Sequence, residues 1–351
     1  MNNIFFNFIR SFPPEVSHYF TIKLLKFYFF TKVQKDDPSL SQHIFGLDFS
    51  NPIGIAAGFD KNVEVVGSLL NLGFGFVEAG TITPKAQFGN QKPRVYRLSE
   101  DNAIINHLGF NNKGSVYAKK KLSRLNLNNL STGVVGINIG KNKDTNDLIK
   151  DYIYCFEQLG PLAHYVTINI SSPNTPGLRD LHERTQLEKL IKDLKKIKNN
   201  SLNLDSKPII IKIAPDLNDD KLRDIALISL ANGIDGIIIS NTTTDRPAYL
   251  LSKNKNRIGG LSGKPLFKKS NLVLKKMYNL TNGQIPLIGV GGINNGVDFY
   301  EKIKSGASLA QIYTALTYQG PGLVQKIKKE ILYQLKIDGY NNIKHAIGKD
   351  V

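Results

Sequence analysis

Short apolar runs recur along the chain from Asn51 onward, each followed by a polar or glycine-rich turn and a longer stretch with helical periodicity. Near-continuous apolar runs of this length are typical of parallel strands that are buried on both faces. Eight such strands alternating with helices predict an α/β protein of the (β/α)8 TIM barrel type, with an open doubly wound sheet as the alternative. The eight runs are NPIGIAAG from Asn51, GFVEAGTIT from Gly75, VVGINIG from Val134, YVTINIS from Tyr165, PIIIKIAP from Pro208, GIIISNT from Gly236, PLIGVGG from Pro286 and LAQIYTAL from Leu309.

Two segments fall outside this alternation. The chain opens with MNNIFFNFIRSFPPEVSHYFTIKLLKFYFF, where charges and Pro13–Pro14 interrupt the apolar positions, so we expect two short helices that do not span a membrane. Such an aromatic, lysine-bearing helix suits a membrane interface, and a helical cap packed on the barrel is the alternative. The stretch from Pro84 to Gly133 predicts extra structure over the barrel mouth. We therefore expect a small N-terminal helical segment over 1–38, a barrel over 39–336 and a C-terminal tail over 337–351.

Composition narrows the chemistry. The 351 residues are 41% hydrophobic and 21% charged, which indicates a globular protein with a large core. Cys155 is the one cysteine, which excludes a disulfide or a cysteine-built iron–sulfur site within this chain, and no histidine spacing suggests a metal site. The net charge of +17 suits a nucleic acid or an anionic membrane surface, or reflects lysine spread over solvated helix faces. No nucleic-acid-binding motif is present, so we expect no nucleic-acid partner, and the cysteine and histidine pattern leads us to expect no metal.

Polar residues and glycines stand where the predicted strands end. Active groups of TIM barrels lie at the carboxyl ends of the strands, so these residues are predicted to face one shared pocket. In strand order they are Gly58 and Lys61, Thr81, Asn138, Asn169 and Ser172, Lys212, Asn241 and Thr242, Gly291 and Gly292, and Tyr313 and Thr314.

Lys212 lies inside the apolar strand IIIKIAP, where a lysine must be paired or neutral. Three interpretations are open at this point. The amine could form a Schiff base with a carbonyl substrate. It could stay charged and stabilise an anion on a bound cofactor, or it could belong to a structural ion pair.

The remaining motifs suggest a phosphorylated, planar ligand. GVGGI, YT and GGLSG stand where barrels bind phosphate through backbone amides. No G-x-S-x-G elbow surrounds Ser172, and His182 is interpreted as a surface histidine at a helix start, so Ser172 suits proton transfer better than nucleophilic attack. Amide side chains that both donate and accept suit an imide edge, and they are provided by Asn106, Asn169, Asn174 and Asn241.

Taken together, these motifs resemble a known family. NISSPNTPGLR, AAGFDKN, INHLGFNN, GINIGKNKDT, IKIAPDL, SNTT, GGLSGKPL and GVGGI are similar to the motifs of class 2 dihydroorotate dehydrogenases, the membrane-associated, quinone-linked kind. The resemblance extends from about residue 5 to residue 330. Class 1 enzymes carry a cysteine as the base in the loop where this chain has Ser172.

The resemblance implies a bound FMN and the oxidation of (S)-dihydroorotate to orotate in de novo pyrimidine (UMP) biosynthesis. Ser172 is then the catalytic base for the C5 proton of the substrate, and Lys212 stabilises the reduced anionic flavin. The implied FMN-binding positions are Ala57, Gly58, Phe59, Asp60, Lys61, Thr81, Asn138, Asn169, Lys212, Ser240, Gly263, Gly292, Tyr313 and Thr314. The implied substrate-binding positions are Lys61, Asn106, His107, Leu108, Gly109, Phe110, Asn169, Asn174, Asn241 and Thr242. The implied quinone site comprises His18, Arg97 and Tyr313.

The resemblance also implies where the enzyme works and with what. The final electron acceptor is a membrane quinone, and the protein is peripheral on the cytoplasmic side of the inner membrane, with no partner protein required. Two hypotheses compete with this one. They are a Schiff-base aldolase that uses Lys212, and a basic membrane-binding protein with a catalytically inert barrel.

Overall fold

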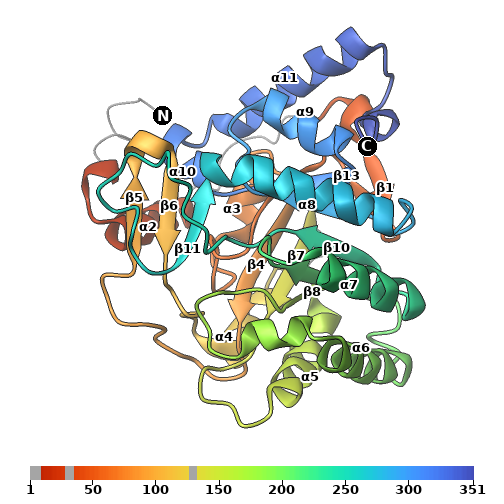
Figure 1. Cartoon of the computed structure of the whole chain (residues 1–351). Coiled ribbons are helices and arrows are strands. Elements are labelled where there is room, and N and C mark those ends of the chain that lie inside the picture. The colour runs from red at the N-terminus through yellow and green to blue at the C-terminus, as the bar shows by residue number, and fades with distance from the viewer. Residues whose placement is uncertain (1–8, 28–34, 126–132) are drawn as a thin grey trace.

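Eight parallel strands close into a barrel at the centre of the computed structural model, which describes residues 9–27, 35–125 and 133–351 (Figure 1). All eight apolar runs of the sequence form barrel strands, so the predicted TIM barrel is confirmed and the open sheet is excluded. Around the barrel the strands neighbour one another in the order β10, β12, β13, β3, β4, β7, β8, β9. Their bounds are β3 (Ile53–Ile55), β4 (Phe76–Ile82), β7 (Val134–Ile139), β8 (Tyr165–Asn169), β9 (Ile209–Ile213), β10 (Gly236–Ile239), β12 (Leu287–Val290) and β13 (Ala307–Ile312).

Helices surround the barrel and bury one face each against it. In α6 (Arg184–Asn199), the leucines and isoleucine at positions 187, 190, 191 and 194 are buried and Lys189, Lys192 and Lys196 are exposed, as a 3.6-residue period requires. The other helices of the barrel domain are α3 (Val66–Asn71), α4 (Gly114–Leu122), α5 (Leu148–Leu159), α7 (Asp219–Ala231), α8 (Phe267–Leu280), α9 (Gly296–Lys304), α10 (Thr314–Gln319) and α11 (Leu323–Asp338).

A hairpin before the barrel and a short helix after it complete the domain. A hairpin of β1 (Gln42–Ile44) and β2 (Leu47–Phe49) covers the amino end, where Phe49 packs edge-on against Phe76 of β4. After α11, Ile343 and Ala346 of a short 3-10 helix are buried in the core. The segment boundaries expected at 38 and 336 stay predictions.

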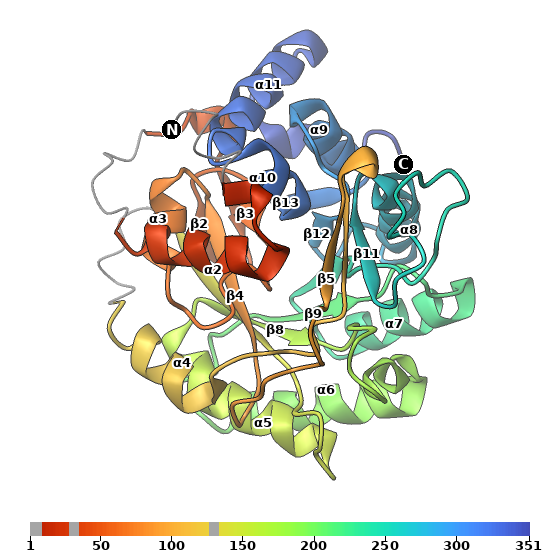
Figure 2. The same ribbon diagram turned by 90° about the vertical axis from the view of Figure 1, so that its left-hand side faces the viewer.

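The insertion between β4 and β7 forms the extra structure that its length predicts. It contributes β5 (Val95–Leu98) and β6 (Ala103–Asn106) to a three-stranded antiparallel sheet completed by β11 (Gly260–Gly263). Helix α2 (Pro14–Leu25) contacts β5 and crosses in front of β3 and β4 in Figure 2. Part of the first short helix expected near the N-terminus, and residues 126–132 of the insertion, lie outside the described residues.

We expect Gly136→Ala to destabilise the barrel. A Cβ atom at Gly136 on β7 would lie 2.0 Å from Cζ of Tyr165, whose ring is fully buried and whose hydroxyl is hydrogen-bonded to Glu78. Overpacking of this kind costs about 1–3 kcal/mol, because the ring has no free space to enter. Urea unfolding of the variant measures the loss. The matched control is Gly67→Ala on α3, where nothing lies within 4 Å of the added Cβ and no loss is expected. An unchanged urea midpoint for Gly136→Ala would contradict this account.

Candidate active site

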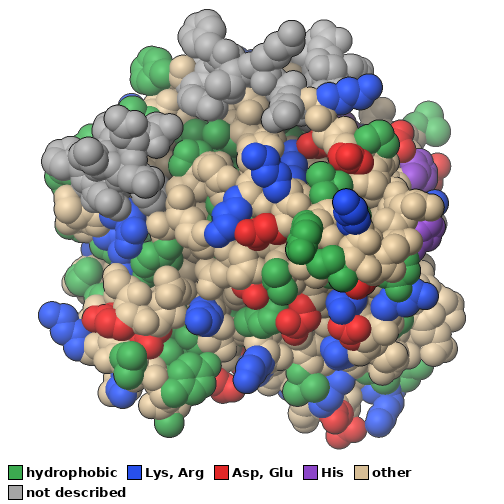
Figure 3. All heavy atoms as spheres, turned by 90° about the horizontal axis from the view of Figure 1, so that it is seen from above, with side chains coloured by type: hydrophobic (Ala, Val, Ile, Leu, Met, Phe, Trp, Pro, Cys, Tyr) green, Lys and Arg blue, Asp and Glu red, His purple; other side chains and the backbone are tan. Residues whose placement is uncertain are grey.

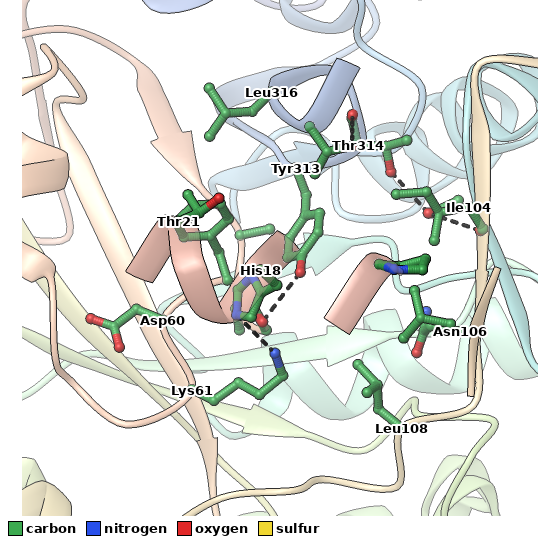
Figure 4. A pocket seen from close by; sticks show the side chains of 18 of the residues that line it. His18, Thr21, Asp60, Lys61, Ile104, Asn106, Leu108, Tyr313, Thr314 and Leu316 are labelled. Atoms are coloured by element: carbon green, nitrogen blue, oxygen red, sulfur yellow. Dashed lines mark hydrogen bonds between the residues drawn. The ribbon is translucent and has the colours of Figure 1, made fainter. Parts of the chain in front are cut away.

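A cavity of about 1020 Å³ lies at the carboxyl ends of the strands, between the barrel, α2 and the sheet of β5, β6 and β11. It is lined by every residue that the sequence analysis assigned to a cofactor, substrate or quinone site, with two exceptions. Asn138 and His107 do not line it, but each contacts a residue that does. Figure 4 shows the region around His18, Lys61 and Tyr313, with Asn106 and Leu108 on the opposite side.

The amides at the floor of the cavity are held in one network. Asn169 donates to Thr81 Oγ1 at 2.9 Å and to Asn138 Oδ1 at 3.2 Å, and Thr81 donates to Asn138 Oδ1 at 2.6 Å. Asn241 donates to Asn169 Oδ1 at 3.4 Å. These bonds connect the ends of β4, β7, β8 and β10, so a ligand meets amides whose orientations are already set.

Glu78 on β4 lies beneath the site, and sequence reasoning did not identify it as part of the site. Its fully buried carboxylate accepts hydrogen bonds from Asn138 at 2.8 Å, Gln311 at 2.9 Å, Thr167 at 3.1 Å and Tyr165 at 3.3 Å. Four donors make it possible to bury this charge beneath the cavity. The signal that could have revealed it is the acidic residue inside the apolar run GFVEAGTIT.

Lys212 on β9 lines the cavity and is 5% exposed. Burial lowers the pKa of its amine, and the nearby charge of Glu78 acts in the opposite direction. The amine forms no hydrogen bond or salt bridge with the described residues, and the ion-pair interpretation therefore lacks a direct partner. A buried cation that lines a cavity in this way is suited to an anionic or acceptor group on a ligand.

The serine loop follows β8 and is tied to the insertion. Ser172 is 6% exposed and lines the cavity, and its Oγ accepts a hydrogen bond from the backbone N–H of Asn174 at 3.2 Å. The Asn174 side chain donates to the backbone and side-chain oxygens of Asn106, both at 3.1 Å, and its Oδ1 lies 3.1 Å from Nδ1 of His107. These contacts hold the loop against the end of β6.

His182 corrects one interpretation of the sequence. It is buried, at 1% exposure, rather than on the surface, and its Nδ1 lies 3.0 Å from the Arg179 carbonyl. Burial, followed by the charge of Arg179, lowers its pKa to about 4. It does not line the large cavity, so the expectation that it does not activate Ser172 stands.

The loop after β3 carries Lys61 to the cavity wall. The Asp60 carboxylate accepts hydrogen bonds from the backbone amides of Glu64 and Val65, both at 2.8 Å, and so orders the loop. Burial raises the pKa of Asp60, and these backbone amides oppose that effect. The Lys61 amine lies 3.3 Å from Nε2 of His18, and burial lowers the pKa of Lys61 to about 8.

Helix α2 is fastened at both ends. Near its start, Arg94 beside β5 forms a salt bridge with Glu15 at 3.0 Å, and Arg97 donates to Oγ of Ser17 at 2.8 Å. Just beyond its end, Lys26 forms a salt bridge at 3.0 Å with Glu64 of the barrel domain. The Arg94–Glu15 pair was missed by sequence reasoning, because its partners are 79 residues apart.

Phe59 and Tyr313 form an aromatic wall of the cavity, which His18 of α2 contacts. The His18 ring lies edge-on to Phe59, with centroids 5.5 Å apart, and Phe59 lies 5.8 Å from the ring of Tyr313. Burial raises the pKa of Tyr313 to about 12, and burial lowers the pKa of His18 well below its usual value. Both groups are therefore neutral near pH 7.

The end of β11, the loop after β12 and the start of α10 form a glycine-lined end of the cavity. Gly263 and Gly292 both have positive φ, and a Cβ atom at Gly292 would lie 2.6 Å from the backbone nitrogen of Phe267. Thr314 donates to Ser262 Oγ at 2.8 Å at the start of α10. The amide of Gly292 donates no hydrogen bond to another described residue, which leaves it available to an anion.

The surface adds two observations. Over the face in Figure 3, lysine and arginine side chains are scattered among acidic and hydrophobic ones rather than gathered in one patch. Within residues 9–27, 35–125 and 133–351, no helix is long and apolar enough to cross a bilayer, and no cluster of three potential metal ligands occurs.

Known proteins resemble the chain over almost its whole length. A family model described as dihydroorotate dehydrogenase matches residues 39–335. The dihydroorotate dehydrogenase (quinone) of Xanthobacter autotrophicus is 47% identical over 346 residues, covering 97% of each chain. That of Parvibaculum lavamentivorans is 48% identical over 339 residues, covering 96% of this chain and 95% of its own.

Solved structures agree in fold. The ligand-free DHODH of Eimeria tenella is 41% identical, with a TM-score of 0.93 over 96% of this chain and 99% of its own. The same enzyme in complex with ferulenol gives a TM-score of 0.92, covering 96% of this chain and 95% of its own. With the barrel, the serine loop and these relatives in agreement, the chain belongs to the dihydroorotate dehydrogenase family and is an oxidoreductase of its quinone-linked class 2.

Proposed function

We propose that the chain oxidises (S)-dihydroorotate to orotate in de novo UMP biosynthesis, with FMN as hydride acceptor and a membrane quinone as final electron acceptor. The observation that supports this most strongly is the placement of Ser172 and Lys212. Ser172 lies in the loop after β8 and Lys212 on the adjacent strand β9, where Lys212 is paired in register with Asn169, and both Ser172 and Lys212 line the same cavity. A proton acceptor and a buried cation are thus brought to one ligand.

The residues fit an FMN. When bound, FMN supplies a two-electron acceptor for the substrate and passes the electrons on to the quinone. Lys212, which has no acceptor among the described residues, would stabilise negative charge on the ring. The backbone around Gly263 and Gly292, with Thr314, would hold the phosphate, since positive-φ glycines present amides to anions. Asn169 and Thr81, fixed by their network, would hold polar edges of the ring.

The substrate would be held by the amides and by Lys61. Asn106, Asn174 and Asn241 offer donors and acceptors to the ring of dihydroorotate, and Lys61 would pair with its carboxylate. Ser172 would take the C5 proton. A serine hydroxyl is a weak base, so its contribution depends on being held at the reacting atom, which the bonds of the serine loop favour.

The colour of the purified protein tests this function first. The full chain should be yellow, and anaerobic dihydroorotate should bleach its flavin absorbance. A colourless protein that is trapped by borohydride with a carbonyl substrate would favour the aldolase hypothesis instead. Tight binding to anionic vesicles with neither colour nor trapping would favour the inert membrane-binding protein.

Orotate binding should weaken as the pH rises through about 8. The pKa of Lys61 is lowered to about 8 by burial, so the amine is charged below that pH and neutral above it. Only the charged amine attracts the carboxylate of orotate. Titration of the flavin spectrum with orotate from pH 6 to pH 10 measures the effect. Lys61→Arg, which stays charged, should remove the pH dependence, and an identical profile in that variant would exclude Lys61 as the partner.

The N-terminal segment would bring the enzyme to the quinone. Helix α2 exposes Val16, Tyr19, Phe20 and Leu24, and all four side chains also line the cavity. Such a surface beside lysines suits a peripheral position on the cytoplasmic face of the inner membrane. An apolar quinone could then enter between α2 and the aromatic wall, near His18, Arg97 and Tyr313.

Removing residues 1–35 should leave the flavin reducible by dihydroorotate but abolish vesicle binding and turnover with a long-chain quinone. The reason is that the barrel strands and the serine loop lie outside the deleted segment, whereas the exposed face of α2 lies inside it. Co-sedimentation with anionic vesicles and quinone turnover are the measurements. Two point variants are matched, because both side chains are exposed and neither change should unfold the protein. Leu24→Asp on α2 should weaken vesicle binding, whereas Leu272→Asp on α8 should not. Full quinone turnover by the truncated protein would rule out this role.

A further inference from the structure

Arg179 connects three loops at the carboxyl ends of neighbouring strands. It lies on a 3-10 helix, Leu178–His182, just after the serine loop and outside the large cavity. Its Nε donates to the Ser171 carbonyl at 3.3 Å, one terminal nitrogen donates to the Asp216 carboxylate at 3.1 Å, and the other donates to the Thr242 carbonyl at 3.4 Å. One side chain therefore reaches the segments that follow β8, β9 and β10.

Each of these partners is next to, or part of, the proposed machinery. Ser171 precedes Ser172, and Thr242 is a proposed substrate contact that follows Asn241. Asp216 anchors the arrangement, because its carboxylate also accepts from the Thr244 amide at 3.0 Å and forms a salt bridge of 2.6 Å with Lys269 of α8. The Ser171 hydroxyl is held separately, since it accepts from Asn241 at 3.0 Å.

We propose that Arg179 is a positioning residue that fixes the serine loop relative to the 241–242 segment, so that Ser172 and Asn241 meet the substrate at a set separation. This inference rests on the proposed function. A planar guanidinium can direct several donors to separate acceptors at once, whereas a lysine amine is a single point charge on a flexible stem. The role therefore requires arginine specifically.

The surroundings of Arg179 fit this role. Its own carbonyl contacts Nδ1 of the buried His182, which fixes the short helix. A small cavity of about 230 Å³ is lined by Arg179, His182, Asp216 and Lys221. Because that cavity borders the guanidinium, a free guanidinium ion has a route to the position that Arg179→Ala would vacate.

The test compares Arg179→Ala and Arg179→Lys with Arg184→Ala in the full-length, flavin-loaded protein. Arg184 is a matched control because it forms a salt bridge with Asp224 at 3.1 Å between the outer helices α6 and α7, and it does not line the large cavity. In Arg179→Ala, anaerobic flavin reduction at saturating dihydroorotate should slow about 10²-fold, as expected for a displacement of about 1 Å at a reacting group. Reoxidation by a soluble quinone should not change, because it does not use Ser172.

Two further readouts separate positioning from general damage. The isotope effect with 5-deuterated dihydroorotate should increase, because a misplaced base slows the C5 proton transfer selectively, whereas partial unfolding lowers the active fraction without changing it. Millimolar guanidinium should restore part of the reduction rate in Arg179→Ala and have no effect on Arg184→Ala. Amide hydrogen exchange of residues 170–177 should be faster in Arg179→Ala than in the control.

Parallel losses in both half-reactions, an unchanged isotope effect or unchanged exchange in the loop would overturn the inference. If Arg179→Ala does not fold, Arg179→Lys decides the question by the same measurements, and wild-type behaviour in that variant would overturn it. If dihydroorotate does not reduce the flavin of the unaltered protein, the proposed function fails, and hydrogen exchange still decides whether Arg179 holds the loop.

Discussion

Ser172→Ala is expected to keep its flavin and to lose most of its ability to be reduced by dihydroorotate, by roughly 10²- to 10⁴-fold. The change removes only the Oγ, which accepts one hydrogen bond from the backbone N–H of Asn174 within its own loop. Asn174 remains bonded to Asn106, and the amide network of Asn169 does not involve Ser172. The structure around the cavity should therefore persist while proton transfer from C5 loses its acceptor.

Anaerobic stopped-flow reduction at saturating substrate is the measurement, since it isolates the half-reaction in which the proton leaves. Ser172→Cys provides the control, because a thiol of similar size can also accept the proton and should retain part of the rate. Ser171→Ala tests whether the neighbouring serine of this turn also contributes to proton transfer. It should be reduced faster than Ser172→Ala, because Ser171 is not lining the cavity. Near wild-type reduction of Ser172→Ala would remove this residue from the mechanism.

The barrel could be predicted from sequence because its signal is local. Each strand is a short apolar run, and a run such as PIIIKIAP keeps its meaning wherever the chain places it. The strand-end residues follow from the same signal, since a barrel brings the carboxyl ends of all its strands together. Thr81 and Asn169 could thus be placed in one pocket without knowledge of any contact between them, and the structure joins them at 2.9 Å.

What sequence could not supply are contacts between residues far apart in the chain. The strand GLSG could be recognised only as a glycine cluster, because its partner β6 is about 150 residues away and antiparallel pairing leaves no local mark. The burial of His182 escaped prediction for the same reason: a polar residue in a short turn resembles a surface residue until its neighbours are known. The carboxylate of Glu78 is buried with four hydrogen-bond donors from three other strands, and no single segment of the sequence indicates that these donors meet.

Lys212 shows most clearly where sequence reasoning ends. Its position in an apolar strand is the same for a Schiff base, a charge near a cofactor or an ion pair, so the sequence left all three open. The structure places no salt-bridge partner beside it among the described residues, but puts the charge of Glu78 close enough to oppose the effect of burial on its pKa. With no partner among the described residues and a place on the cavity lining, the amine is available to a group on a ligand.

Lys212→Met should therefore leave the barrel folded, weaken flavin retention and slow flavin reduction by about 10²- to 10³-fold, the usual cost of removing one preorganised electrostatic contact. Methionine keeps the apolar stem and removes the charge, so that packing inside β9 is preserved. Flavin content after dialysis and anaerobic reduction per bound flavin are the two measurements.

The control for Lys212→Met is another buried lysine that does not line the cavity. Lys328 on α11 is 6% exposed and paired with Asp36, and Lys328→Met should lower the thermal midpoint while the reduction rate per bound flavin stays that of the wild type. Borohydride treatment adds an independent test, because a Schiff base at Lys212 would be trapped with a carbonyl compound and a charged, unreactive amine would not. If Lys212→Met retains and reduces its flavin as the wild type does, Lys212 is structural, and the buried cation in the cavity lining has no part in the reaction.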